Sequence, residues 1–235
     1  MQDAVRIWAP LAKRLDVLVG DQRLEVVREH GGWWRGPVLA NGADYAISAD
    51  AGPPRPDPRS RWQPAGVHGR SRWIEPASVP APARFTQVPL RDAVIYELHV
   101  GTFSREGTFA GAIDHLDHLV ELGVSHVELM PVAQFSGTHG WGYDGVDLYA
   151  PHAAYGGPAG LHALIAACHE RKLAVLIDVV HNHLGPEGAY LPELGPCNFA
   201  DVPAHLESTG DVVLASCDLA SHRELPPMCC ALVRK

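Results

Sequence analysis

The sequence lacks the long apolar runs that mark membrane proteins. No stretch approaches the roughly 20 consecutive apolar residues that a membrane-spanning helix requires. The first residues place Asp3 and Arg6 where a signal peptide would need continuous apolar sequence. We therefore predict a cytoplasmic protein that does not associate with membranes.

Clusters of positive charge are also missing. The chain has 19 Lys and Arg against 27 Asp and Glu, a formal net charge of −8, and the basic residues form no run. Because a phosphate backbone is bound through clustered positive charge, nucleic acid is not expected as a partner. An uncharged or small ligand fits this composition better.

Cysteine is scarce, and its spacing shows no pairing motif. Only Cys168 lies in the regular part of the sequence, and the other four fall between residues 197 and 230 without a Cys-x-x-Cys pair. An odd total argues against a complete disulfide framework, and no set of zinc ligands accompanies these residues. We expect free thiols, no metal and no cofactor.

The first fifty residues have the pattern of short antiparallel strands. Apolar and polar residues alternate near residues 5–9, 15–19, 24–27 and 34–38, and breaks such as Gly20-Asp21 and Asn41-Gly42 separate them. We predict a small immunoglobulin-like β-sandwich over residues 1–50. Residues 51–90 are rich in proline, which disfavours helices and central strands, so we predict a linker or strap there.

The period changes after residue 90. Residues 93–100 (AVIYELHV), 127–132 (VELMPV) and 174–180 (AVLIDVV) are compact apolar strands, and residues 111–122 and 161–168 have helical spacing. Strands that are apolar on both faces and alternate with helices predict a covered parallel sheet. The first strand–helix turn lacks the glycines of a dinucleotide-binding fold. We therefore predict the first three βα units of an incomplete TIM-type (β/α)8 barrel over residues 91–196.

The regular pattern ends near residue 196. Residues 197–235 show no readable period and contain most of the cysteines. We expect an atypical tail there and hypothesise that it derives from a shifted reading frame or a truncated gene model.

Two groups of residues suggest chemistry. Residues 178–183 (DVVHNH) follow a predicted strand, where they either hydrogen-bond a ligand at the barrel mouth or satisfy backbone groups; a metal site is a weaker third interpretation. Residues 140–151 (GWGYDGVDLYAP) present aromatic rings that suit the C–H faces of sugars, or that pack on their own barrel. Both loops and His99 should lie on one side of the barrel.

The acids expected of a glycosidase are not evident. Glycoside hydrolysis ordinarily uses two carboxyl groups, about 5–5.5 Å apart when configuration is retained. Glu97 and Glu128 lie inside predicted strands and Asp144 lies in a loop, so these acids do not form a convincing pair.

Several motifs in order resemble the α-amylase superfamily. They are residues 97–109, 128–132, 141–146 and 178–183, the last resembling its first diagnostic region. Within the superfamily, residues 57–69 (DPRSRWQPAGVHG) are similar to the strap of malto-oligosyltrehalose trehalohydrolases and match branching enzymes less well.

The resemblance implies a site for an α-glucan or a maltooligosyl trehalose. In such enzymes the residues matching Tyr143 and His183 contact the sugar, and those matching Asp178 and Asn182 organise the strand end. We add Trp141, Asp144 and His99 to the predicted substrate-binding residues. The family's nucleophilic aspartate and acid glutamate follow later strands, so no catalytic residue is predicted in this chain, and we expect the chain alone to be inactive.

Three other interpretations remain open. The parent could be a 1,4-α-glucan branching enzyme. The chain could instead be a non-catalytic glucan-binding module that uses Trp33, Trp34 or Trp62. A small α/β hydrolase is a third interpretation, although no Gly-x-Ser-x-Gly motif supports it.

Overall fold

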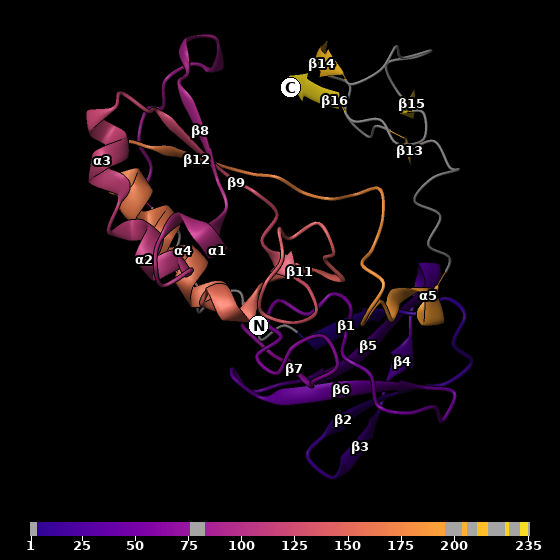
Figure 1. Ribbon diagram of the computed structural model, residues 1–235. Helices are drawn as coiled ribbons and strands as arrows, with labels where there is room; N and C mark the ends of the chain where they lie inside the picture. Colours follow the sequence, from indigo (N-terminus) through magenta and orange to yellow (C-terminus); the bar gives the residue numbers. More distant parts are fainter. Residues whose placement is uncertain are drawn as a thin grey trace. The chain divides into compact units, whose positions relative to one another are not determined.

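A computed structural model describes residues 4–75 and 83–195, and beyond them the backbone of four short strands. The chain divides into two compact units (Figure 1). The first comprises Met1–Val179 and Gly185–Gly195, and the second comprises Val180–Leu184 and Pro196–Lys235.

Two antiparallel sheets form the N-terminal part of the first unit. Three strands are ordered β1-β5-β4 and four are ordered β3-β2-β6-β7. The bounds are β1 Ala4–Trp8, β2 Leu15–Val19, β3 Gln22–Glu25, β4 Val27–Arg28, β5 Trp33–Val38, β6 Asp44–Ala49 and β7 Ser71–Arg72, with a 3₁₀ turn, η1, at His30–Gly32. The strands expected near residues 5, 15 and 34 are thus confirmed. The strand expected over residues 24–27 is instead divided between β3 and β4, which belong to different sheets.

Side chains from both sheets share one hydrophobic core. Ile7 and Trp34 from the three-stranded sheet pack in the same buried cluster as Val17 and Ile47 from the four-stranded sheet. Ile7 and Trp34 alternate with more exposed neighbours, as the period-two geometry of a strand predicts, whereas the neighbours of Val17 and Ile47 are themselves buried. The turn between β2 and β3 uses Gly20, whose φ is +57°, a conformation that favours glycine.

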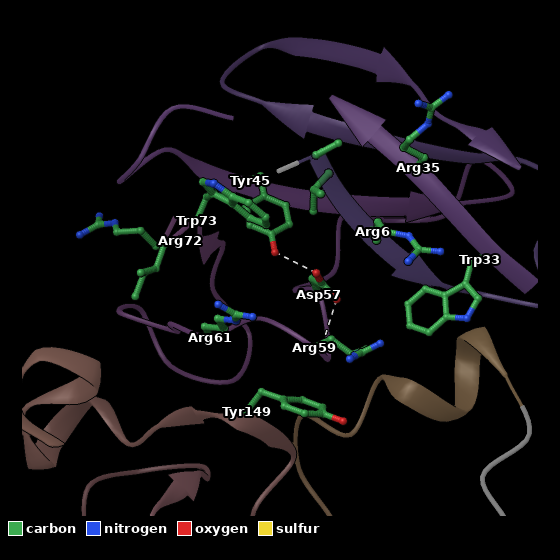
Figure 2. A pocket seen from close by; sticks show the side chains of 13 residues that line it. Arg6, Trp33, Arg35, Tyr45, Asp57, Arg59, Arg61, Arg72, Trp73 and Tyr149 are labelled. Atoms are coloured by element: carbon green, nitrogen blue, oxygen red, sulfur yellow. Dashed lines mark hydrogen bonds between the residues drawn. The ribbon is translucent and has the colours of Figure 1, made fainter. Parts of the chain in front are cut away.

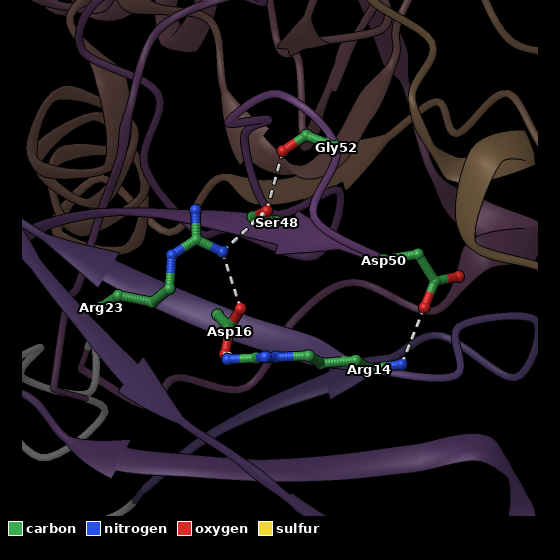
Figure 3. Close-up of polar contacts among 6 residues, drawn as sticks. All are labelled: Arg14, Asp16, Arg23, Ser48, Asp50 and Gly52. Atoms are coloured by element: carbon green, nitrogen blue, oxygen red, sulfur yellow. Dashed lines mark hydrogen bonds and ion pairs between the residues drawn. The ribbon is translucent and has the colours of Figure 1, made fainter.

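One acid inside the four-stranded sheet is fully satisfied (Figure 3). Asp16 on β2 is 1% exposed, and its carboxylate accepts hydrogen bonds from Arg23 at 2.7 Å and, on its other oxygen, from Arg14 at 3.3 Å. Arg23 also donates to the Ser48 hydroxyl, which donates in turn to the Gly52 carbonyl. The buried charge is therefore paired on both oxygens, as a stable interior carboxylate requires.

The proline-rich segment contains little regular structure. Between residues 51 and 75 its only strand is the two-residue β7, which lies at a sheet edge, where proline-rich sequence is tolerated. Trp62 from this segment packs against Gly157, so closely that a Cβ at Gly157 would overlap the indole ring.

A parallel sheet follows, with strand order β12-β9-β8. The helices α2, α3 and α4 lie along it (Figure 1), and their apolar side chains share a core with the strands. The bounds are β8 Ile95–Leu98, α1 Val100–Phe103, α2 Phe109–Ile113, α3 Leu116–Glu121, β9 His126–Leu129, α4 Gly157–Glu170 and β12 Ala174–Ile177, with 3₁₀ turns η3 at Leu90–Asp92 and η4 at Ala153–Tyr155 and a short helix α5 at Leu191–Leu194.

The elements differ in detail from the sequence-based expectation. The single helix predicted over residues 111–122 is two helices, because His115 N–H bonds to the carbonyl of Ala112 and ends α2. The first parallel strand ends at Leu98, since the His99 carbonyl already accepts the first helical hydrogen bonds of α1. The predicted long loop after β9 contains an antiparallel hairpin of β10 Ala133–Gln134 and β11 Asp147–Pro151.

The outer edges of the parallel sheet are open. Within residues 83–195, neither β8 nor β12 pairs with a further strand. Apolar side chains on and beside these strands are exposed: Val94, Ile95, Tyr96, Ile177 and Val179.

The second unit contains four short strands in two antiparallel pairs. β13 Ala204–His205 pairs with β15 Glu224–Leu225, and β14 Asp211–Ala215 pairs with β16 Ala231–Arg234. The predicted atypical tail, residues 197–235, otherwise lies outside the described residues. Among the helices that the structure describes, none has the length and apolarity needed to cross a bilayer.

Candidate functional site

The carboxyl ends of the three parallel strands carry a group of polar side chains. Glu97 on β8 and Glu128 on β9 are partners in the strand register. Leu98 and Leu129, the next residues, are buried among the helices, so the two glutamates lie on the opposite face of the sheet. Neighbouring strands lie about 4.8 Å apart, which makes the glutamates direct neighbours on this face.

Tyr143 reaches this group from the loop between β10 and β11. Its hydroxyl donates a hydrogen bond to Asp178 Oδ2 at 3.1 Å. Asp178 follows β12 directly, and its backbone N–H bonds to the Leu129 carbonyl at 2.9 Å. The end of β12 thus positions a carboxylate that orients the Tyr143 ring, which is 40% exposed.

The surroundings of Tyr143 favour the protonated form of its hydroxyl. Partial burial raises the pKa of Tyr143, and the hydrogen bond to Asp178 and the charges of Asp178, Glu97 and Glu128 raise it further. The same effect shows that both glutamates lie within electrostatic reach of the ring. Because the Tyr143 O–H donates to Asp178, this group offers a polyhydroxyl ligand hydrogen-bond acceptors: the phenol oxygen and the carboxyl oxygens.

Glycines hold the Tyr143 loop against the strand end. Gly142 has a φ of +87°, and a Cβ there would overlap the carbonyl oxygen of Pro131, just beyond β9. Gly185 N–H bonds to the Gly145 carbonyl at 3.1 Å, and a Cβ at Gly185 would overlap the Asp144 carbonyl oxygen. The loop therefore depends on close backbone approach at both positions.

His99 is engaged by the protein. Its Nδ1 lies 3.0 Å from the Thr102 hydroxyl, and its Nε2 lies 2.8 Å from the Gly140 carbonyl and 3.0 Å from the Tyr155 hydroxyl. These contacts confirm that His99 and the loop after β9 lie together. A direct contact of His99 with substrate stays a prediction.

The remaining predicted residues differ in their surroundings. Trp141 is 70% exposed, and Asp144 is exposed beside it in the same loop. Asn182 and His183 belong to the second unit, where both are exposed and His183 Nδ1 lies 3.0 Å from Asn182 Oδ1. Their roles in sugar binding and in ordering the strand end stay predictions. No cluster of three or more metal-ligating side chains occurs among the residues that the structure describes.

The pairing of Glu97 with Glu128 is not evident from the sequence, where each acid lies inside its own strand. The available signal is the shared Glu-Leu dipeptide, in which leucine faces the helices and glutamate the other side in both strands. The two glutamates are thus neighbours in the sheet. The expectation that these acids do not form a catalytic pair stays a prediction.

A buried acid, Asp147, lies within the hairpin itself. Asp147 on β11 is 1% exposed, and among the described residues its Oδ2 has no hydrogen-bond partner. Burial raises the pKa of Asp147 to about 8, and the charge of Asp57 acts in the same direction. Gln63 lies close enough to lower this pKa, although its amide makes no well-formed hydrogen bond. His152 is also buried, and burial lowers its pKa to about 4.

We expect Asp147→Asn to stabilise the chain above neutral pH. The folded protein holds the Asp147 proton to about pH 8, whereas the unfolded chain releases it near pH 4, so stability is lost as pH rises between these values. The variant removes this loss, so its free energy of unfolding at pH 8.5 should exceed that of the parent by about 1–3 kcal/mol. The lowered pKa of His152 has the opposite effect: it reduces the stability of the fold as pH falls, but only below about pH 6.5.

Thermal unfolding from pH 6.5 to 8.5 isolates the contribution of Asp147. The matched control is Asp16→Asn, which should destabilise the chain because Arg14 and Arg23 lose their buried partner. A variant at Asp147 that is no more stable than the parent at pH 8.5 would contradict the prediction.

Comparison with known proteins gives consistent results. The malto-oligosyltrehalose trehalohydrolase of Mycobacterium tuberculosis is 51% identical over 197 residues, which cover 81% of this chain and 34% of that protein. The 1,4-alpha-glucan branching enzyme GlgB of Saccharophagus degradans is 31% identical, covering 75% of this chain and 28% of that enzyme. The crystal structure of a candidate α-amylase from Salmonella typhimurium superposes with a TM-score of 0.76 at 43% identity, covering 80% of this chain and 33% of that one.

The chain thus spans about a third of the length of the curated relatives that it matches. The model of the α-amylase catalytic domain matches residues 78–195, half of the sequence. Together with the parallel strands and helices over the same residues, this match shows that the chain belongs to the α-amylase family and contains part of its TIM-barrel glycoside hydrolase fold.

Proposed function

We propose that this chain contributes to the release of trehalose from maltooligosyl trehalose, by hydrolysis of the α-1,4 bond beside the terminal trehalosyl unit. The observation that carries the proposal is the Tyr143–Asp178 pair at the strand ends, in a chain 51% identical to a trehalohydrolase. The branching-enzyme alternative is less well supported, because the identity falls to 31%.

The proposal assigns each segment a part. Residues 1–50 form a β-sandwich domain, residues 51–90 a strap, and residues 91–196 the first three βα units of the (β/α)8 barrel. Tyr143 and His183 contact the sugar, Trp141, Asp144 and His99 complete the binding surface, and Asp178 and Asn182 order the strand end. The nucleophile and the general acid come from later strands of the family barrel.

The alternative of a separate glucan-binding module has less support. Each tryptophan considered for it is engaged by the protein: Arg6 and Arg59 lie over the Trp33 ring, Trp34 is buried and donates to the Ala9 carbonyl, and Trp62 packs on Gly157. A sugar would have to displace these contacts to stack there.

A chimera tests the proposed function. Residues 1–195 are joined to the part of the Mycobacterium tuberculosis relative that follows its matching segment, and trehalose release from maltooligosyl trehalose is measured. We expect hydrolysis by the chimera and none by the 235-residue chain, because general acid catalysis alone contributes about 10²–10⁴-fold and the nucleophile is also supplied by the added part. A folded chimera that transfers glucan branches without releasing trehalose would contradict the proposal and favour the branching enzyme.

A further inference from the structure

A pocket lies in the first unit, and its described lining does not include Tyr143, Asp178 or the two glutamates of the strand ends. It has a volume of about 620 Å³ and is lined by the N-terminal strands, the proline-rich segment and one residue of β11, Tyr149. This volume is within the range of sites for small organic ligands. Five arginines line it (Figure 2): Arg6, Arg35, Arg59, Arg61 and Arg72.

Two of the five arginines have no ion-pair partner among the residues that the structure describes. Arg6 and Arg35 share Glu29, and Arg72 is paired with Asp44. Within the described part of the chain, Arg59 and Arg61 form no ion pair, and both are exposed.

Among the described residues that line the pocket, Asp57 is the one with a carboxyl group. Asp57 is buried, accepts hydrogen bonds from the Tyr45 hydroxyl at 2.8 Å and from the Arg59 backbone N–H at 2.9 Å, and has its pKa raised by burial. Asp57 interacts electrostatically with Arg59, but one carboxyl group cannot offset the charges of both Arg59 and Arg61. The pocket is therefore positive, although the chain as a whole is acidic.

Aromatic rings hold the Arg59 guanidinium in place. It lies over the Trp33 ring at 4.7 Å and over the Tyr149 ring at 5.0 Å, and Arg6 also lies over Trp33, at 5.1 Å (Figure 2). A stacked guanidinium keeps its N–H edge free for planar, bidentate recognition of an anion. Because the guanidiniums cover Trp33, a neutral sugar cannot stack on it without displacing them.

We propose that this pocket binds the phosphoryl group of a small organic phosphate, such as a phosphorylated monosaccharide. Arg59 and Arg61 supply the charge-assisted hydrogen bonds that a phosphate prefers. The volume beyond the phosphoryl group accommodates the rest of the ligand. The proposal is independent of the catalytic function, since no residue of the pocket belongs to the Tyr143 group.

Calorimetric titration of the 235-residue chain tests the proposal, with glucose 6-phosphate, inorganic phosphate and glucose at one low ionic strength. We expect saturable binding of glucose 6-phosphate and none of glucose. Inorganic phosphate shows whether the organic part of the ligand matters. If it binds more weakly than glucose 6-phosphate, the site is assigned to an organic phosphate. If the two bind equally, the site is assigned to the free ion. The double variant Arg59→Gln/Arg61→Gln should weaken binding by about 100-fold, the loss expected for two bonds between charged groups.

Arg105→Gln is the matched control, because it removes the same charge at an exposed position outside the pocket and should leave the affinity within about twofold. Arg59 and Arg61 are exposed, so the double variant should keep the parent's melting temperature and circular dichroism. Binding of glucose as tight as that of its phosphate, undiminished binding by the double variant, or no binding of either phosphate would overturn the proposal.

Discussion

Replacing Asp178 by alanine in the chimera is expected to lower kcat/KM for maltooligosyl trehalose by roughly 100-fold. The Asp178 carboxylate is the hydrogen-bond acceptor that orients Tyr143, whose ring is otherwise exposed in a loop. Losing that orientation misplaces a substrate-positioning side chain, and small displacements of such groups cost about this factor. Steady-state kinetics of trehalose release measure the effect.

Two further variants separate positioning from general loss of structure. Tyr143→Phe keeps the ring and loses only the hydroxyl, so the expected loss is smaller, about tenfold. Asp21→Asn changes an exposed acid in the turn after β2 and should leave kcat/KM unchanged. If Asp178→Ala retained full kcat/KM, Asp178 would have no part in the site.

The second large effect is on stability. We expect Gly157→Ala to destabilise the chain by about 2–5 kcal/mol. Its φ of +59° already disfavours a side chain, at about 1–2 kcal/mol, and the new Cβ would overlap the Trp62 ring, adding about 1–3 kcal/mol. Urea unfolding followed by circular dichroism measures the loss.

Gly20→Ala is the matched control for Gly157→Ala. Gly20 has nearly the same φ, +57°, but a Cβ added there would meet no atom within 4 Å, so it reports the backbone cost alone. The difference between the two variants therefore measures the packing of Trp62 on the start of α4. Equal losses would mean that this contact contributes nothing to stability.

Much of the fold could be predicted because its signals are local. The alternation in β1 and β2 and the apolar run of β9 each specify a strand from a few neighbouring residues. The break between α2 and α3 could not be predicted, since it depends on one hydrogen bond at His115 in a sequence with uninterrupted helical spacing. The β10–β11 hairpin could not be predicted either, because its strands pair across a twelve-residue loop that carries loop-like glycines.

The candidate site was only partly predictable for the same physical reason. Tyr143 and Asp178 were recognisable in their motifs, but their hydrogen bond joins residues 35 positions apart. The arginine pocket was invisible, because its charges come from separate strands and from the proline-rich segment, while the overall charge of −8 points away from an anion site.

The open edges of β8 and β12 have a practical consequence for every measurement on this chain. An unpaired strand edge with apolar side chains can pair with the same edge of another molecule. Such pairing is a second-order process, so its extent grows with protein concentration. Dilute solutions therefore report the properties of the single chain, whereas concentrated ones report those of its assemblies.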